Sequence, residues 1–251
     1  MTVNPIPDSM DCLGILMLDT CFPRPLGDIG NPKSFVVPVR SQVVRQAVPA
    51  SVVRSAAVFA QSEFTADFAH AARLLAQRGV WAITSSCGFL VLIQADIQSA
   101  VPDVPVRTSS LLQLPALLAR HDQVGVLTID ASALGVDHLL AAGVPKHRLP
   151  DVLVQGIERS TEFVSKILGN QLTMNFIEAQ NNVVDAAMRL KQKLPSLAHV
   201  VLECTNMPPY QLAIEQKTGL KCWSLRDDPV LCRLAKENGY TALASALSYL
   251  P

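Results

Sequence analysis

Short apolar runs alternate along the chain with longer segments of helical periodicity. Four runs have no polar face, as expected for parallel strands that are buried on both sides: 13–18, 80–83, 124–129 and 199–202. Seven segments have the apolar spacing or the boundary residues of helices: 65–77, 89–97, 110–119, 133–142, 174–193, 209–217 and 229–237. Strands and helices that alternate in this way predict an α/β fold with mostly parallel sheets flanked by helices.

Single residues mark the ends of some predicted helices. Ser132 is a candidate N-cap for the helix 133–142, and Gly143 ends that helix. Gly79 ends the helix 65–77 in the same way.

Two segments of the chain repeat one design. Leu13–Asp19 (LGILMLD) and Val124–Asp130 (VGVLTID) are both glycine-containing apolar strands that end in Asp. Cys87 follows the first segment at about the same distance as Cys204 follows the second. We therefore predict two similar lobes, each with one cysteine at a strand end, although such strands are common enough for coincidence to be the alternative. Ligands bind at the carboxyl ends of parallel strands, so both cysteines are expected in one cleft between the lobes.

The surroundings of these two cysteines favour acid–base chemistry. Cys87 stands in Thr84–Gly88 (TSSCG) and Cys204 in Glu203–Asn206 (ECTN), each with small hydrogen-bonding neighbours and a helix to follow. A thiol with a reference pKa of about 8.5 is mostly protonated at neutral pH, so a helix N-terminus or neighbouring donors must activate it. Two such thiols on opposite sides of a carbon can remove a proton from one face and return one to the other. For a lone cysteine, burial as a small filler is the alternative.

The remaining cysteines and the histidines lack such contexts. Four cysteines are interpreted as packing residues, with some reserve for Cys21 because it lies near the site: Cys12, Cys21, Cys222 and Cys232. No C-x-x-C pair and no Cys/His cluster has zinc spacing, so no metal is expected and the thiols are predicted to be reduced. The five histidines are expected on the surface: His70, His121, His138, His147 and His199.

Composition restricts the class of protein. The chain has 251 residues, 49% of them hydrophobic and 17% charged, which is typical of a globular protein with a large core. A net charge of +0 without a basic patch argues against a nucleic-acid partner. No apolar stretch has the roughly 18–20 residues of a membrane helix, and segment 1–10 lacks the features of a secretion signal, so a cytoplasmic location is expected.

Three short motifs in order resemble the aspartate/glutamate racemase superfamily, with its hydantoin racemases, arylmalonate decarboxylases and maleate isomerases. They are LDT at 18–20, TSSCGF at 84–89 and ECTNM at 203–207, and the resemblance extends from about residue 13 to 223. It implies two pseudo-symmetric α/β lobes, a cofactor-independent mechanism with two cysteines, and commonly a homodimer. It also implies an inserted second lobe: residues 1–112 with 208–251 would form lobe 1, and 113–207 lobe 2.

The chain departs from the best-known members of that superfamily at two places. Glutamate racemases carry an Asp-Ser-Gly loop after the first strand, where this chain has Asp19-Thr20-Cys21. They also place a His just after the second cysteine's Thr, and aspartate racemases often place a Glu there. This chain has Asn206, which cannot act as a general base. The resemblance therefore leaves the substrate open.

The predicted site combines the catalytic pair Cys87 and Cys204 with donors for a small carboxylate. Candidate substrate-binding residues are Asp19, Thr20, Arg24, Thr84, Ser85, Ser86, Gly88, Thr205 and Asn206. Asp19 would hold an ammonium or amide nitrogen, and Arg24 or Arg40 a distal carboxylate. Asp19 could instead be a structural cap, and the hydroxyls at 84–86 could cap a helix. Segment 27–32 has the composition of a turn, either a solvated loop or a loop over the cleft.

Three functions fit these residues. The first is an isomerase: a cofactor-independent racemase or epimerase of an amino acid or a derivative, which uses both cysteines. The second is a maleate-isomerase-like or arylmalonate-decarboxylase-like enzyme on a small diacid, although a decarboxylase needs only one cysteine. The third is a non-catalytic small-molecule binding protein, which would not need the cysteines. No nucleic acid, membrane or cofactor is expected as a partner.

Overall fold

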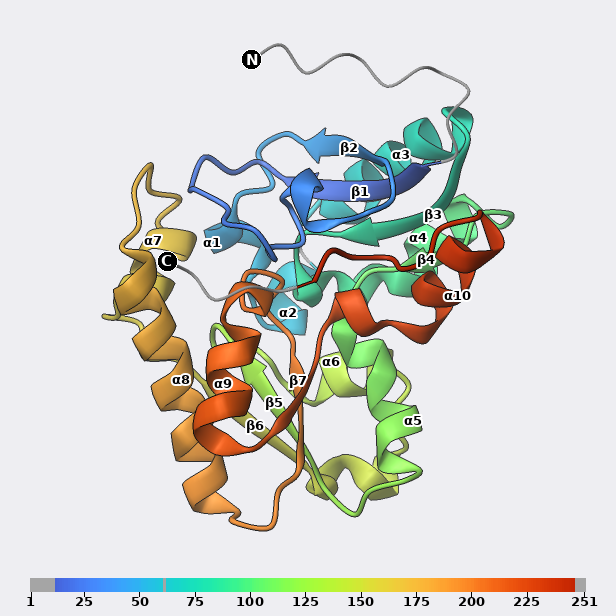
Figure 1. Ribbon diagram of the computed structural model, residues 1–251. Coiled ribbons are helices and arrows are strands. Elements are labelled where there is room, and N and C mark those ends of the chain that lie inside the picture. Colours follow the sequence, from blue (N-terminus) through green and yellow to red (C-terminus); the bar gives the residue numbers. More distant parts are fainter. Residues whose placement is uncertain (1–11, 61, 247–251) are drawn as a thin grey trace.

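Two parallel four-stranded sheets form the framework of the computed structural model, which describes residues 12–60 and 62–246 (Figure 1). In spatial order the first sheet contains β2 (Val39–Val44), β1 (Cys12–Leu18), β3 (Val80–Ser85) and β4 (Val106–Arg107). The second contains β6 (Val152–Gly156), β5 (Val124–Thr128), β7 (His199–Leu202) and β8 (Lys221–Trp223). The predicted α/β class is confirmed. Segment 1–10 lies outside the described residues.

The two sheets have the same topology. β1 and β5 take the second position in their sheets, and β3 and β7 take the third. The two Gly-containing strands that resemble each other in sequence are therefore equivalent in the fold. Cys87 follows β3 and Cys204 follows β7, so each cysteine lies just beyond the carboxyl end of an equivalent strand.

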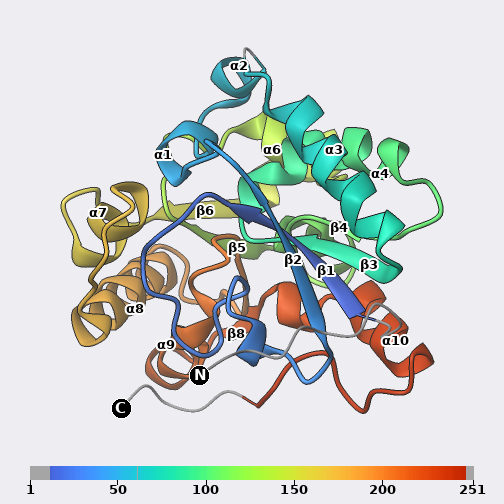
Figure 2. The same ribbon diagram turned by 90° about the horizontal axis from the view of Figure 1, so that it is seen from above.

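β1 is buried on both faces because its alternate residues belong to two different cores. Leu16 and Leu18 pack in the larger core together with Phe68 of α3 (Phe64–Gln77). Leu13 and Ile15 face the opposite side and share a smaller core with α10 (Pro229–Glu237). Figure 2 shows α3 and α10 on opposite sides of the first sheet. The period of two along a strand explains why the sequence shows one continuous apolar run here.

Long helices cover the second sheet. α8 (Phe176–Lys193) begins at Asn175, whose side chain accepts hydrogen bonds from the backbone N–H groups of Ile177 and Glu178. α8 packs between α7 (Glu162–Leu168) and α9 (Gln211–Thr218). The shorter α-helices are α1 (Pro49–Val52), α2 (Ala56–Phe59), α4 (Gln94–Ala100), α5 (Leu114–Leu118) and α6 (Val136–Ala141). The 3-10 helices are η1 (Pro32–Ser34), η2 (Gly88–Ile93), η3 (Ser110–Gln113), η4 (Lys146–Asp151), η5 (Pro208–Tyr210) and η6 (Leu225–Asp227).

The boundary between the lobes lies later in the chain than residue 207. β8 pairs with β7 in the second sheet, with Val200 opposite Cys222, so residues 221–223 do not belong to the first lobe. The chain returns to the first lobe with η6 and α10, where Leu225 and Leu231 pack in the smaller core against the first sheet. The division implied by the resemblance placed the end of the second lobe at residue 207, before β8.

Some helix predictions were also wrong in detail. Segments 89–97 and 110–119 each begin as a 3-10 helix and continue as an α-helix. Ser132 does not cap α6, because its hydroxyl donates to the carboxylate of Asp130 at 2.6 Å and Gly135 precedes the helix instead. In residues 12–60 and 62–246, no helix combines the length and apolar character that a membrane crossing requires.

Candidate active site

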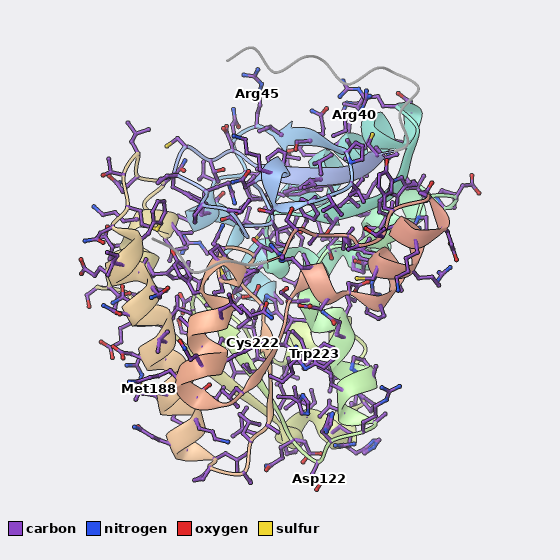
Figure 3. The ribbon with its side chains drawn as sticks, in the orientation of Figure 1. Arg40, Arg45, Asp122, Met188, Cys222 and Trp223 are labelled. Carbon is purple, nitrogen blue, oxygen red and sulfur yellow. The ribbon has the colours of Figure 1, made fainter. Side chains whose placement is uncertain are left out.

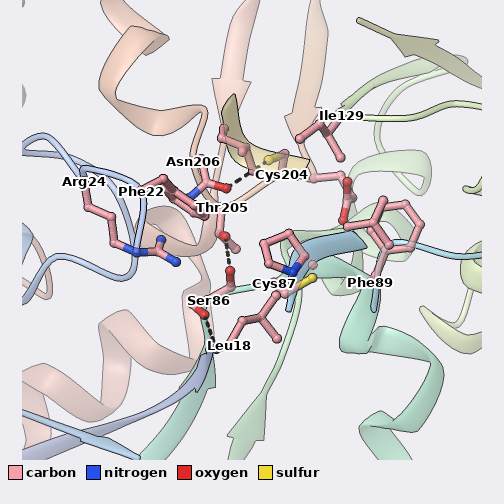
Figure 4. Close-up of a pocket in the computed structure, with 15 residues that line it drawn as sticks. Leu18, Phe22, Arg24, Ser86, Cys87, Phe89, Ile129, Cys204, Thr205 and Asn206 are labelled. Atoms are coloured by element: carbon pink, nitrogen blue, oxygen red, sulfur yellow. Dashed lines mark hydrogen bonds between the residues drawn. The ribbon is translucent and has the colours of Figure 1, made fainter. Parts of the chain in front are cut away.

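Cys87 and Cys204 line the same cavity between the two lobes, which has a free volume of about 20 Å³ (Figure 4). Each cysteine is 6% exposed. The cavity walls are mainly apolar: Leu18, Phe22, Pro49, Val53, Phe89, Ile129 and Ile167. The other lining residues, apart from the cysteines, are Arg24, Ser86, Gly88, Glu203, Thr205 and Asn206. This volume has room for about one water molecule, and the polar side chains of the lining come from both lobes.

Ser86 and Thr205 join the two cysteine-bearing strand ends. The hydroxyl of Thr205 donates to the backbone carbonyl of Ser86 at 2.6 Å, and the hydroxyl of Ser86 accepts from the backbone N–H of Leu18 at 3.0 Å (Figure 4). Thr205, which follows Cys204, is thus hydrogen-bonded to Ser86, which precedes Cys87. The predicted small polar neighbours set the relative position of the thiols.

Thr84 and Ser85 do not line the cavity. The hydroxyl of Thr84 donates to the carbonyl of Arg107, and that of Ser85 donates to the carbonyl of Thr108 at 2.6 Å. Ser85 also accepts from the backbone N–H of Cys87 at 3.3 Å. These contacts support the structural interpretation, since both side chains fix the backbone that carries Cys87.

Residues 27–30 of the loop after β1 are buried, so segment 27–32 is not the solvated loop of the first interpretation. Asp28 is 1% exposed and accepts hydrogen bonds from Arg24 at 2.7 Å and from the side-chain amide of Asn206 at 2.8 Å. The backbone N–H of Ile29 donates to the carbonyl of Thr205 at 3.1 Å. The loop is therefore attached to the segment that carries Cys204. Sequence reasoning missed Asp28, because nothing in a turn-like segment indicated burial.

Arg24 lines the cavity, and its guanidinium is paired with the Asp28 carboxylate at 2.7 Å. Its guanidinium lies 4.4 Å from the ring centroid of Phe22 and donates to the hydroxyl of Thr20 at 3.0 Å. Thr20 and Asp19 are not among the lining residues, and the Asp19 carboxylate accepts from the backbone N–H of Gln46 at 3.1 Å. Asp19 thus has the structural contact that the alternative interpretation required.

Arg40 lies away from the cavity. It is on β2, opposite Gly14 of β1, and Figure 3 shows it with Arg45 on the side of the first lobe that faces away from the second. Of the two arginines proposed to bind a distal carboxylate, only Arg24 lines the cavity.

Both cysteines are neutral thiols in this environment. Burial raises the pKa of Cys87 to about 12, and the nearby carboxyl of Glu203 adds to the rise. Hydrogen bonds from the backbone N–H groups of Phe89 and Leu90 act in the opposite direction but are outweighed. Burial also raises the pKa of the Cys204 thiol, with Glu203 as the next cause. The backbone N–H groups after Cys87 lower the pKa of its thiol, as expected at the start of a helix. Burial raises that pKa by more.

The side chain of Asn206 stabilises the protonated form of Cys204, whereas the backbone N–H of Asn206 lowers the pKa of that thiol. The Cys204 thiol donates to Asn206 Oδ1 at 3.5 Å, while Asn206 Nδ2 donates to the Asp28 carboxylate. A carboxylate can only accept, so Asp28 fixes the orientation of the amide and turns its oxygen towards the thiol. Asn206 was expected to donate to a thiolate, and in this arrangement its side chain accepts from the thiol instead.

Glu203 is a buried acid that sequence reasoning did not assign to the site. It is 0% exposed, and burial raises its pKa to about 8. Its Oε2 accepts from the hydroxyl of Thr128 at 2.7 Å, whereas Oε1 is buried with no hydrogen-bond partner. The signal in the sequence was a carboxylate placed directly between an apolar strand and a cysteine.

His138 is not on the surface. It is 0% exposed, its ring meets the ring of Phe89 edge-on at 4.9 Å, and its Nδ1 accepts from the backbone N–H of Gly135. Burial lowers the pKa of His138 to about 4, so the ring is neutral and supports the cavity wall from behind Phe89.

Cys21 and Asn170 form a contact between the lobes that we term the clasp. The backbone N–H of Cys21 donates to Asn170 Oδ1 at 2.7 Å, and its thiol donates to the backbone carbonyl of Asn170 at 2.8 Å. Asn170 follows α7, and Cys21 follows β1. Cys21 is exposed, whereas Cys12 and Cys222 are fully buried packing residues as expected. No group of three or more His, Cys, Asp or Glu side chains in the described part of the chain is arranged to hold a metal ion.

Solved structures of similar fold cover nearly the whole chain. A glutamate racemase from Francisella tularensis in complex with D-glutamate has a TM-score of 0.55 and 17% identity, covering 95% of this chain and 86% of its own. An unliganded arylmalonate decarboxylase has a TM-score of 0.54 and 14% identity, covering 94% of this chain and 96% of its own. These likenesses show that the chain shares its fold with such enzymes.

Curated relatives at higher identity carry a different name. Dimethylsulfoniopropionate lyase 7 from Emiliania huxleyi is 29% identical over 218 residues, and a dimethylsulfoniopropionate lyase from Durusdinium sp. clade D is 28% identical over 215. Each alignment covers 83% of this chain, but 62% and 69% of the relatives. The chain thus spans roughly two thirds or less of the length of the curated relatives that it matches. No protein-family model matches it.

Proposed function

We propose, from the premise that the chain has the fold of the aspartate/glutamate racemase superfamily, that it is an enzyme that removes the proton α to a carboxylate. The observation that carries this proposal is the position of Cys87 and Cys204 in one cavity, at the carboxyl ends of equivalent strands in two equivalent sheets. One thiolate would be the base, and the second thiol would lie across the substrate from it.

The names of the curated relatives suggest which reaction follows this proton removal. Dimethylsulfoniopropionate has a carboxylate, an α-carbon with protons and a dimethylsulfonium group on the β-carbon. When a thiolate takes the α-proton, the C–H electron pair forms the double bond. The bond between the β-carbon and sulfur breaks with its electron pair on sulfur. Dimethyl sulfide leaves, and acrylate remains. We therefore favour a lyase over the racemase expected from sequence.

The cavity offers suitable partners for both ends of this substrate. The rings of Phe22 and Phe89 lie in its walls, and aromatic faces attract organic cations such as a sulfonium. The guanidinium of Arg24 is the cation in the lining that can meet a carboxylate. A bound sulfonium would also favour a thiolate nearby, which offsets the desolvation that keeps the thiols protonated.

Cys87 is our candidate for the base. The backbone N–H groups of Phe89 and Leu90 and the charge of Arg24 favour its thiolate form. Cys204 instead has its proton directed at Asn206 Oδ1, so it is suited to remain a thiol.

Release of dimethyl sulfide tests the proposal. We expect the purified chain to release dimethyl sulfide from dimethylsulfoniopropionate, measured by headspace gas chromatography. Cys87→Ser should lower kcat/KM by about 10²–10⁴-fold. Cys222→Ser is the control, because Cys222 is equally buried but lies outside the cavity lining. Absence of release by the unaltered chain, or full activity of Cys87→Ser, would refute the lyase.

A racemase is the second candidate, because a one-base elimination does not explain why both strand ends carry a cysteine. In this case both Cys87→Ser and Cys204→Ser should abolish racemisation of amino acids, followed by chiral chromatography. Solvent deuterium should enter at the α-carbon during the reaction. Racemisation that survives in either variant would exclude the two-base mechanism.

A further inference from the structure

Glu203 lies where the two cysteine-bearing segments meet, and we term the contact between Glu203 and Gly88 the seam. It directly precedes Cys204, and its Oε1 is so close to Gly88 that a Cβ added there would lie 2.3 Å from it. Gly88 directly follows Cys87, and both Gly88 and Glu203 line the cavity. A carboxyl group therefore sits against both strand ends that carry the proposed acid and base.

The hydrogen bonds of Glu203 are incomplete in a specific way. Oε2 accepts from the hydroxyl of Thr128, which lies on β5, and this contact fixes the carboxyl group. Oε1 is fully buried and has no partner. A buried charge without a second partner would be costly, so the neutral acid, with its proton on Oε1, is the form that this environment favours.

A neutral carboxyl group at this position is a hydrogen-bond donor whose own acceptor is absent from the protein. Removal of an α-proton moves negative charge onto the substrate carboxylate, and donors aimed at that charge stabilise the transition state. A protonated carboxyl in an apolar site can serve as such a donor, since it adds no negative charge of its own.

We propose that Glu203 is a catalytic residue that donates a hydrogen bond from Oε1 to a carboxylate oxygen of the substrate. This inference rests on the proposed α-proton removal. It assigns Glu203 to the stabilisation of charge and leaves proton transfer to the cysteines. Gly88 is then required because any larger residue would displace the Glu203 side chain.

Glu203 is the group in this part of the cavity that we expect to ionise near a pH of about 8, because its titratable neighbours keep one protonation state there. The nearby thiols have pKa values raised by burial, and His138 behind Phe89 is neutral because burial lowers its pKa to about 4. Tyr210, whose pKa burial also raises, is neutral in the same range. Asp28 is paired with Arg24. The charged and titratable groups on the surrounding elements are Arg24, Asp28, Cys87, Asp130, His138, Cys204 and Tyr210.

The pH dependence of two variants separates a donor from a structural residue. Glu203→Gln keeps the shape, an oxygen for Thr128 and an N–H donor, but it does not ionise. The neutral acid is the active form, so its contribution is present below a pH of about 8 and lost above it. The ratio of kcat/KM between the unaltered chain and Glu203→Gln should be constant at low pH and fall about tenfold per unit above that value. Both proteins contain Cys87 and Cys204, so the effect of thiol ionisation on kcat/KM cancels in this ratio.

Two more variants complete the test. Glu203→Leu has similar volume and no donor, and it should lower kcat/KM for dimethylsulfoniopropionate by about 10²–10³-fold. Thr128→Val removes the hydrogen bond that lowers the pKa of Glu203, so the break in the pH profile should move to higher pH. A flat ratio from pH 6 to 10, or full activity of Glu203→Leu, would overturn the proposal.

Binding of propionate tests the same contact without turnover. By calorimetry, the affinity of the unaltered chain for sodium propionate should weaken above a pH of about 8, while that of Glu203→Gln should not. Propionate that does not bind, or binds both proteins with one pH dependence, contradicts the role of Glu203. Loss of dimethyl sulfide release with normal pH-dependent propionate binding would instead count against the proposed lyase.

Discussion

Gly88 is a residue at which a single methyl group is expected to matter. An added Cβ would lie 2.3 Å from both the backbone oxygen and Oε1 of Glu203, and the backbone oxygen cannot move aside easily. Glycine is thus required by the close approach of the two lobes. The sequence suggested glycine for a tight turn or for contact with a ligand, but the neighbour that needs the space is part of the protein.

We expect Gly88→Ala to lower the free energy of unfolding by about 1–3 kcal/mol, because the extra group overpacks the seam. Activity should fall as well, since the strand ends move apart. Urea denaturation measures the first effect. Gly135→Ala is the matched control, because no atom lies within 4 Å of a Cβ at Gly135 and its φ is −99°. Equal stability of the two variants would mean that the seam is not tightly packed.

At the scale of elements, apolar runs predicted the central strands well and the edge strands poorly. β1, β3, β5 and β7 are buried along nearly their whole length, so they appear as uninterrupted apolar runs. β2, with the sequence VRSQVV, is buried only at its end residues Val39 and Val44, and β8 has three residues. Such edge strands owe their conformation to pairing with a neighbour, which a local pattern cannot reveal.

The same limit explains which site residues the sequence identified. Cys87 and Cys204 were recognisable because each has small polar neighbours after an apolar run. Glu203 and Asp28 owe their burial to distant partners, Thr128 on β5 and Asn206 beyond β7. Their environment forms only when the lobes meet. Nothing in the sequence indicated it for Asp28, and for Glu203 the one sign was its position between an apolar strand and a cysteine.

Asp228 joins α10 to the first sheet. Its carboxylate accepts from the backbone N–H groups of Val230 and Leu231 at the start of α10 and from Arg107 of β4 at 2.9 Å. The Asp228 side chain is 0% exposed. We expect Asp228→Ala to cost about 3–5 kcal/mol of stability, because it leaves a partly buried guanidinium unpaired and removes a helix cap. Thermal unfolding measures this, and a change below about 1 kcal/mol would show that the cap and ion pair are dispensable.

At the scale of the molecule, the two equivalent sheets are joined by the larger core, to which both lobes contribute, and by the loop after β1. Asp28 is central to that attachment, since it accepts from Arg24 of its own loop and from Asn206 beyond β7. Phe22 and Arg24 of this loop form part of the cavity wall. Stability and the shape of the site therefore depend on the same contacts.

Asp28→Ala should be costly because the Arg24 side chain, 11% exposed, would lose its carboxylate. We expect a loss of about 3–5 kcal/mol in urea denaturation. The control is Asp151→Ala, whose partner Arg148 is 24% exposed and whose own side chain is 34% exposed, so the expected change is below about 1 kcal/mol. Equal losses would mean that the Asp28 network does not hold the lobes together.

The clasp between Cys21 and Asn170 has a consequence for how molecules reach the buried sulfurs. Cys21 is exposed, while Cys87 and Cys204 are each 6% exposed behind it. Iodoacetamide should therefore alkylate Cys21 first, and the inner pair only as often as the lobes part. The rate at which the inner pair is alkylated, followed by mass spectrometry, would set a lower limit on the rate at which the lobes part.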